Sequence, residues 1–255
     1  MIEVQDLKKV FKLTRQQKKE KGASAGNGTV EAVSGISFTC KPGRVFSLLG
    51  ANGAGKTTTL RMIATMLKPT AGSIKVNGFD VQTQPKEVRK RLGFLTGSTG
   101  LYDRLTPKEL VKYYADLYAM DKAAFEQRRD ELFDKLDMHD FVNSRIAKLS
   151  TGMKQKVSIV RTIIHDPEIV VFDEPTAGLD VITARTIMDM IRDFRERGKT
   201  IIFSTHIMGE VSLLSDDLAI IHNGKLCYSG TYKEFVAQMQ TKSLEDEFIK
   251  IVEEA

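Results

Sequence analysis

Three short and almost wholly apolar runs constrain the fold of this chain most strongly. They are residues 45–49, 169–172 and 200–204. A strand with one face in water alternates apolar and polar residues, whereas a continuously apolar strand is covered on both faces. Helix-length segments separate the three runs. We therefore expect an α/β fold, in which helices cover a mostly parallel sheet.

The rest of the chain continues this alternation of short strands and helices. Runs rich in β-branched and aromatic residues predict further strands at 2–4, 33–40, 73–76, 92–95, 217–222 and 225–229. Helical spacing predicts helices at 56–67, 86–91, 107–119, 123–136, 153–165, 182–196, 209–214 and 232–238. The polar, glycine-rich stretch from Arg15 to Gly28 is expected to be a surface loop within an N-terminal β region.

A segment at about 99–165 is expected to form a helical subdomain between the two α/β parts. Thr106, Pro107 and Glu109 match a capping box with proline in the first turn of a helix. Four residues at helical spacing follow, and we expect them to face the core: Leu110, Tyr113, Tyr114 and Leu117.

Charge and cysteine content argue against several classes of protein. The net charge is +5, but the basic residues are scattered among acidic ones, so we expect no nucleic-acid partner. Cys40 and Cys227 are far apart and lack neighbours at metal-ligand spacing, which predicts buried thiols in a reducing compartment. The N-terminus has no signal-peptide pattern, and no run approaches the roughly 20 apolar residues of a membrane span. We expect a cytoplasmic protein whose membrane attachment comes through a partner.

The segment that follows the first apolar run matches the phosphate-binding pattern G-x-x-x-x-G-K-[ST]. It reads Gly50, Ala51, Asn52, Gly53, Ala54, Gly55, Lys56 and Thr57, with Thr58 next. The glycines allow the backbone N–H groups to surround a phosphate, and the helix N-terminus adds partial positive charge. Lys56 is predicted to reach the β- and γ-phosphates of ATP, and Thr57 to offer its hydroxyl to Mg²⁺.

Two acidic residues end the second apolar run. Asp173 and Glu174 follow residues 169–172, so they should lie at the carboxyl edge of the sheet beside the phosphate loop. Asp173 is predicted to hold Mg²⁺, directly or through water. Glu174 is predicted to be the general base for the attacking water.

The order of further motifs resembles the ATPases of the ATP-binding-cassette (ABC) family. The signature motif of that family is matched by Leu149, Ser150, Thr151, Gly152 and Met153, and the D-loop aspartate by Asp180. His206, after the third apolar run, matches the family's switch histidine, and Phe11 the aromatic residue that stacks on adenine. A core position in the β subdomain is an equal alternative for Phe11.

The resemblance covers nearly the whole chain and implies a P-loop core with an antiparallel β subdomain and the inserted helical subdomain. Residues 1–238 would be the ATPase domain, and 239–255 a short helical tail. It also implies that the signature acts on ATP held by another subunit, so that two copies form a head-to-tail dimer. The ATPase would sit on the inner face of the membrane, bound to a permease.

Two positions depart from the family pattern. Gly97 stands where a glutamine is usual, and Ser98, Thr99 or a water molecule would have to substitute for the amide. Arg44 stands where an acidic residue is common.

Finer resemblance is to ATPase subunits of ABC-2-type exporters, most of all those that extrude sodium ions. It rests on residues 53–59, 100–106 and 243–248. A drug or small-molecule exporter is the alternative, followed by a soluble ABC ATPase. Import is disfavoured because little chain follows residue 229.

Overall fold

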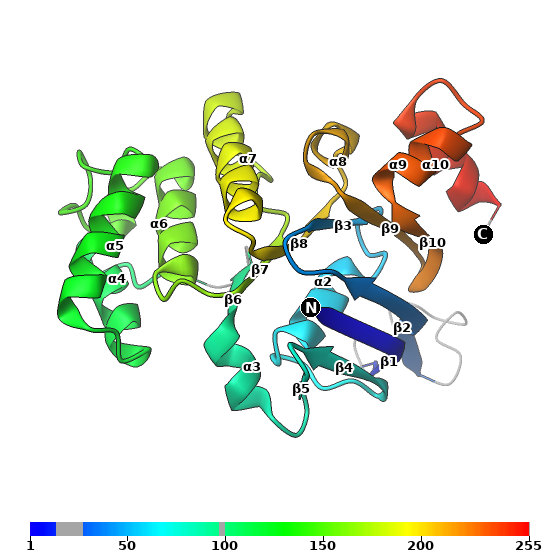
Figure 1. Cartoon of the computed structure of the whole chain (residues 1–255), viewed down its shortest axis with the longest axis horizontal. Helices are drawn as coiled ribbons and strands as arrows, with labels where there is room; N and C mark the ends of the chain where they lie inside the picture. Colours follow the sequence, from blue (N-terminus) through cyan, green and yellow to red (C-terminus); the bar gives the residue numbers. More distant parts are fainter. Residues whose placement is uncertain (14–27, 97–99, 255) are drawn as a thin grey trace.

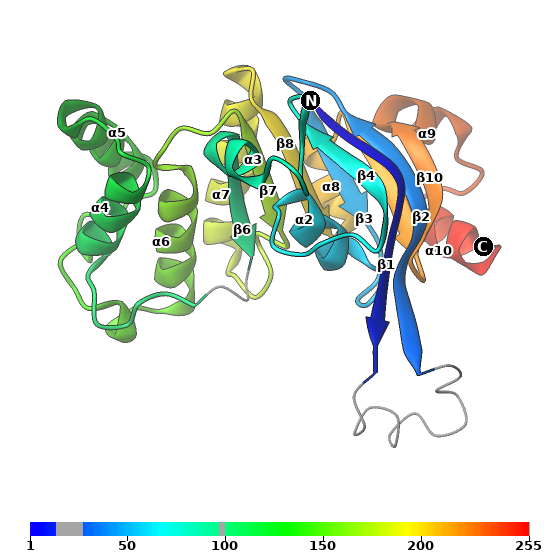
Figure 2. The same ribbon diagram turned by 90° about the horizontal axis from the view of Figure 1, so that it is seen from below.

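The computed structural model describes residues 1–13, 28–96 and 100–254. Two sheets lie at the centre of the molecule, with a group of helices at one end and the C-terminal helices at the other (Figures 1 and 2). The expected loop from Arg15 to Gly28, apart from Gly28 itself, and the departure at Gly97 lie outside the described residues. None of the described helices is long and apolar enough to cross a bilayer.

The larger sheet has six strands and is mostly parallel, as the sequence predicts. Its order is β10-β9-β3-β8-β7-β6. The bounds are β3 Val45–Leu49, β6 Leu92–Thr96, β7 Ile169–Asp173, β8 Thr200–Thr205, β9 Asp217–His222 and β10 Lys225–Thr231. Only β10 runs antiparallel to its neighbour within this sheet.

Both faces of the large sheet are buried, which explains its continuously apolar strands. Val170 and Phe172 of β7 pack into one core cluster with α6 and α7, while Ile169 and Val171 pack into a second with α2 and the smaller sheet. Alternate residues of one strand therefore stabilise two separate hydrophobic layers.

The smaller sheet is antiparallel and has four strands in the order β2-β1-β4-β5. Its strands are β1 Ile2–Lys12, β2 Thr29–Cys40, β4 Ala71–Val76 and β5 Phe79–Asp80. The first pair is longer than predicted, because bulges between Val4 and Val10 let the ladder continue past polar residues.

The α-helices agree with the predicted ones within a few residues, and the short 3₁₀ helix η2 was not predicted. They are α2 Lys56–Ile63, α3 Pro85–Arg91, α4 Pro107–Leu117, α5 Lys122–Lys135, η2 Ile146–Lys148, α6 Thr151–Ile163, α7 Val181–Glu196, α8 Met208–Leu214, α9 Tyr232–Gln238 and α10 Leu244–Glu253. Helix α2 ends before the predicted Leu67, since Thr65 takes a left-handed backbone conformation with φ 61°.

The expected core stripe of α4 is wrong in part. The capping box of Thr106 and Glu109 is present. Leu110 is buried, but Tyr113 and Leu117 are exposed. The buried face instead includes Val111 and Ala115. Residues at i and i+3 or i+4 share one helix face, and the sequence contained two overlapping sets of this kind.

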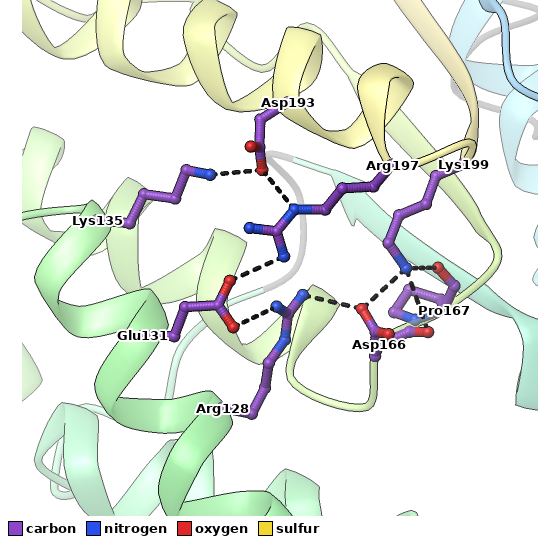
Figure 3. A network of polar contacts seen from close by, with 8 residues as sticks. All are labelled: Arg128, Glu131, Lys135, Asp166, Pro167, Asp193, Arg197 and Lys199. Carbon is purple, nitrogen blue, oxygen red and sulfur yellow. Dashed lines mark hydrogen bonds and ion pairs between the residues drawn. The ribbon is translucent and has the colours of Figure 1, made fainter.

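A chain of ion pairs joins the helical segment to the large-sheet part of the molecule (Figure 3). Glu131 of α5 accepts hydrogen bonds from Arg128 at 2.9 Å and from Arg197, just beyond α7, at 2.8 Å. Arg128 also reaches Asp166, which precedes β7 and pairs with Lys199. Burial raises the pKa of Glu131, but the hydrogen bonds from the two arginines outweigh it and leave the pKa below its ordinary value.

Glu131→Gln should lower the stability of the protein at neutral pH. A lowered carboxyl pKa stabilises the folded state above the unfolded pKa, and this contribution is lost as the pH falls through the folded pKa. The group is partly exposed to solvent. We therefore expect a loss of about 1 kcal/mol at pH 7, measured from urea unfolding, that shrinks below pH 5 or so. Glu126→Gln, at an exposed position of the same helix, is the control and should change little. A difference between Glu131→Gln and the unmodified protein that stays constant across this pH range would contradict the interpretation.

Candidate active site

The phosphate loop runs from the end of β3 to the start of α2, where the sequence places it. Gly55 has φ 110°, and a Cβ atom there would lie 2.5 Å from the backbone oxygen of Ala32. A Cβ atom on Gly50 would lie 2.4 Å from the backbone oxygen of Ile221. Glycine is required at both positions, because neighbouring strands pass too close for any side chain.

Lys56 is buried at the centre of this loop. Its ammonium donates hydrogen bonds to the backbone oxygens of Gly50 at 2.7 Å and Ala51 at 3.1 Å. It also lies 3.3 Å from Oε1 of Glu174. The hollow beside it has a volume of about 130 Å³ and is lined by Ala32, Asn52, Gly53, Ala54, Gly55, Lys56, Thr57, Thr58 and Glu174. The predicted phosphate-binding residues thus gather around one cationic recess.

The acidic pair reaches this recess from β7, although β8 lies between β7 and β3. The hydroxyl of Thr57 donates to Oδ1 of Asp173 at 2.9 Å, and the hydroxyl of Ser204 donates to the same oxygen at 2.7 Å. Carboxylate and hydroxyl oxygens are ligands that Mg²⁺ prefers, and one or two of them with phosphate oxygens form its usual site. The pair of Thr57 and Asp173 therefore fits a magnesium ion.

Glu174 holds a backbone conformation that is unusual for its residue type. Its φ is 49°, in the left-handed region, and a proline follows it. Its N–H donates to the backbone oxygen of Ser204 at 3.2 Å and to the Ser204 hydroxyl at 3.1 Å. The turn aims the carboxylate at the recess, where Nδ1 of His206 lies 3.4 Å from Oε1.

The signature residues form a second site, at the N-terminal ends of α6 and α7. Helix α6 begins at Thr151, two residues before the predicted Met153, because the Ser150 hydroxyl caps it by accepting from Met153 N at 3.3 Å. Asp180 caps α7 by accepting a hydrogen bond from Thr183 N at 2.9 Å. This bond and a second one from the Thr183 hydroxyl lower the pKa of Asp180. A hollow of about 370 Å³ joins the two helix ends, and it shares no lining residue with the recess at Lys56.

Gly152 lies where these two helix ends meet. A Cβ atom at this position would lie 3.4 Å from the Thr183 hydroxyl, at the limit of ordinary van der Waals contact. The N–H groups at the two helix N-termini are hydrogen-bond donors that an anion could use here. Leu149 is buried behind them and packs in the core.

Phe11 lies on β1 opposite Val30, and 39% of its surface is exposed. The ammonium of Lys9 lies 5.2 Å from the centre of its ring. The exposed ring argues against the core alternative, and its role in stacking on adenine stays a prediction.

Three polar residues of this region were not predicted as functional. Ser204 connects Asp173 and Glu174, and Gln155 donates to the backbone oxygen of Pro175 at 2.7 Å. Glu210 is buried and accepts hydrogen bonds from Thr205 and Thr176. For Ser204 the sequence did offer a signal: a small polar residue follows the apolar run 201–203, at a sheet edge where ligands bind.

A glycine-rich loop between a strand and a helix, with a buried lysine and an acidic strand end beside it, defines a P-loop nucleotide-binding protein. Comparison with known proteins identifies the group: the family model described as "ABC transporter" matches residues 33–177. The chain belongs to this family, and it is an ATP-binding, ATP-hydrolysing subunit, as the sequence predicts.

The chain is similar to several curated proteins of this family. "ABC transporter ATP-binding protein NatA" of Bacillus subtilis is 44% identical over 84% of this chain and 88% of that protein. "Nod factor export ATP-binding protein I" of Rhizobium etli is 36% identical over 83% of this chain and 67% of that protein. A solved "Structure of ATP binding subunit of ABC transporter" superposes with a TM-score of 0.84 at 27% identity, covering 98% and 99% of the two chains. A dimeric ATP-binding cassette bound to ADP and Pi shares the fold, with a TM-score of 0.78 at 24% identity over 91% of this chain and 98% of that one.

Lys56→Ala should reduce ATP hydrolysis by roughly 100-fold or more, because a buried cation that stabilises transferring phosphate charge is removed. The measurement is phosphate release by the purified protein with its membrane partner. Lys90→Ala, at an exposed lysine of α3, is the control and should retain full activity. Activity within a few-fold of the unmodified protein in Lys56→Ala would exclude the phosphate-loop assignment.

Proposed function

We propose that this chain hydrolyses ATP in a head-to-tail homodimer that drives an exporter through a bound membrane permease. The observation that carries the proposal is the cluster of Glu174, Lys56 and His206 at the sheet edge. Oε1 of Glu174 lies 3.3 Å from the Lys56 ammonium and 3.4 Å from Nδ1 of His206. A base, a cation and an imidazole converge where a γ-phosphate would enter the loop.

The residues divide the reaction as follows. The N–H groups of residues 50–58 and the Lys56 ammonium bind the phosphates, and Thr57 with Asp173 would hold Mg²⁺. The Glu174 carboxylate accepts a proton from the attacking water, and His206 orients that water against the γ-phosphate. Bound Mg²⁺ supplies charge neutralisation at the phosphate oxygens. Phe11 would stack on the adenine ring.

Two observations support the head-to-tail pairing. The signature residues Ser150, Thr151, Gly152 and Met153 line a hollow separate from the phosphate loop of their own chain, and Leu149 packs in the core behind it. Beside it, Val181 and Ile182 are 85% and 81% exposed at the start of α7, although both are large and apolar. Burial of such side chains against a second copy would stabilise a dimer that places the signature and Asp180 on the partner's nucleotide.

The relatives support a membrane partner and an exporting direction. ABC ATPase subunits of transporters act with a permease, which would hold this chain at the cytoplasmic face of the membrane. The relative named as a Nod factor export ATP-binding protein favours an exporter. Sodium ions are the first candidate for the exported substrate, with a drug or another small molecule as the alternative.

Glu174→Gln should bind ATP but hydrolyse it at least about 100-fold more slowly, since an amide cannot accept the proton of water. Slow hydrolysis should also trap an ATP-bound dimer, which size-exclusion chromatography with Mg²⁺ and ATP would detect. Glu168→Gln is the matched control, since Glu168 precedes the other end of β7 and bonds to Asn77. A monomeric Glu174→Gln protein that still hydrolyses ATP would refute the proposed function.

Mixed dimers test whether each site is built from two chains. When Lys56→Ala and Ser150→Arg lie on different chains, one site carries both defects and the other is intact, so about half of the activity per dimer should remain if the sites act independently. When both changes lie on one chain paired with an unmodified chain, each site carries one defect and activity should be nearly lost. Equal activity of the two arrangements would refute the shared-site proposal.

A further inference from the structure

Glu210 is a buried carboxylate, and each of its two oxygens accepts a hydrogen bond. It lies in the first turn of α8, and only 6% of its surface is exposed. The hydroxyl of Thr205 donates to Oε2 at 2.5 Å, and the hydroxyl of Thr176 donates to Oε1. Hydrogen bonds to a buried carboxylate are among the stronger ones in proteins.

The two threonines belong to the two segments that carry the proposed chemistry. Thr176 is two residues after Glu174, and Thr205 directly precedes His206. The Thr205 hydroxyl also accepts a hydrogen bond from the N–H of Ile207 at 3.0 Å, so both residues that flank His206 are held. Glu210 is thus the common attachment point of the loop after β7 and the loop after β8.

We propose that Glu210 is a positioning residue for ATP hydrolysis, which sets the distance between Glu174 and His206. The proposal rests on the proposed function of those two residues. Glu210 itself lies behind them and would touch neither nucleotide nor water.

The backbone of Glu174 explains why such a restraint is needed. A left-handed conformation is unfavourable for a residue other than glycine and persists only where surrounding contacts hold it. On the side of β8, the Ser204 hydroxyl holds Glu174 by accepting a hydrogen bond from the Glu174 N–H. On the far side of Pro175, Thr176 is held by Glu210. Release of the second anchor would let the carboxylate move, and a displacement of about 1 Å can reduce a rate by about 100-fold.

Glu210→Ala should reduce kcat for ATP by roughly 10- to 100-fold while the binding constant for an ATP analogue changes less than about two-fold. The hydrogen-bond partners of Glu210, Thr205 and Thr176, belong neither to the phosphate loop nor to the predicted adenine site, so we expect nucleotide binding to be spared. The matched control is Glu247→Ala, which removes a carboxylate that is 7% exposed and accepts from the N–H groups of Gln240 and Thr241. It should lower the melting temperature without changing kcat.

Threonine variants keep the test decisive if Glu210→Ala does not fold. Thr176→Val removes one of the two hydrogen bonds at nearly constant volume and should lower kcat, whereas Thr176→Ser retains the hydroxyl and should restore most of it. Equal losses for valine and serine, or loss of nucleotide binding in parallel with kcat, would assign Glu210 a purely structural role and overturn the proposal.

A double-mutant cycle with His206→Ala provides the second readout. If Glu210 acts by placing His206 against Glu174, its removal should cost much less in the His206→Ala background than in the unmodified protein. Additive losses would overturn the positioning role. These outcomes are separate from failure of the proposed function, which Glu174→Gln and Lys56→Ala test without any change at Glu210.

Discussion

The hydrogen bond between Thr57 and Asp173 is the contact on which the arrangement of the site depends. It joins the first turn of α2 to the end of β7 across 116 positions of sequence. Strand β3, which leads into α2, and strand β7, which ends in Asp173, are not neighbours, because β8 runs between them. A parallel sheet brings all three carboxyl ends to one edge, so a loop, an acid and a histidine from distant segments meet without special connections.

Because β8 lies between β3 and β7, its residue Ser204 can contact both acidic residues at the end of β7. Its hydroxyl donates to Asp173 and accepts from the N–H of Glu174, so the proposed metal ligand and the proposed base share one anchor. Serine at this position is buried, and a buried hydroxyl must satisfy its hydrogen bonds. The strand is therefore apolar where it faces the two cores and polar at the residue where the sheet ends.

Local sequence patterns predicted the parts of this molecule that local interactions decide. The phosphate loop, the apolar strands and the capping box of Thr106 required only residue type and spacing. The exposed face of α4 could not be predicted, since it depends on which side of the helix meets α6. Glu210 gave no signal either, because its threonine partners lie five and 34 positions away.

Arg44 illustrates how a departure from a family pattern can be compensated within the fold. Its guanidinium donates to both carboxylate oxygens of Asp217 at 2.7 Å, and to the backbone oxygen of Asp216 at 3.1 Å. These bonds raise the pKa of Arg44 and join the start of β3 to the start of β9. The charge at this position stabilises the end of the sheet opposite the phosphate loop.

The recess at Lys56 and the hollow at the signature residues are separate within one chain, so two copies are needed to enclose one nucleotide if both sites act on it. If the phosphate loop of one copy and the signature of another close on one nucleotide, the bonds to the γ-phosphate are also bonds between the copies. Loss of that phosphate then removes contacts on which the dimer depends, while the ion pairs of Arg128, Glu131 and Arg197 keep the helical segment attached to its own chain. The copies would separate as whole bodies, so that hydrolysis changes the distance between them with little rearrangement inside each one.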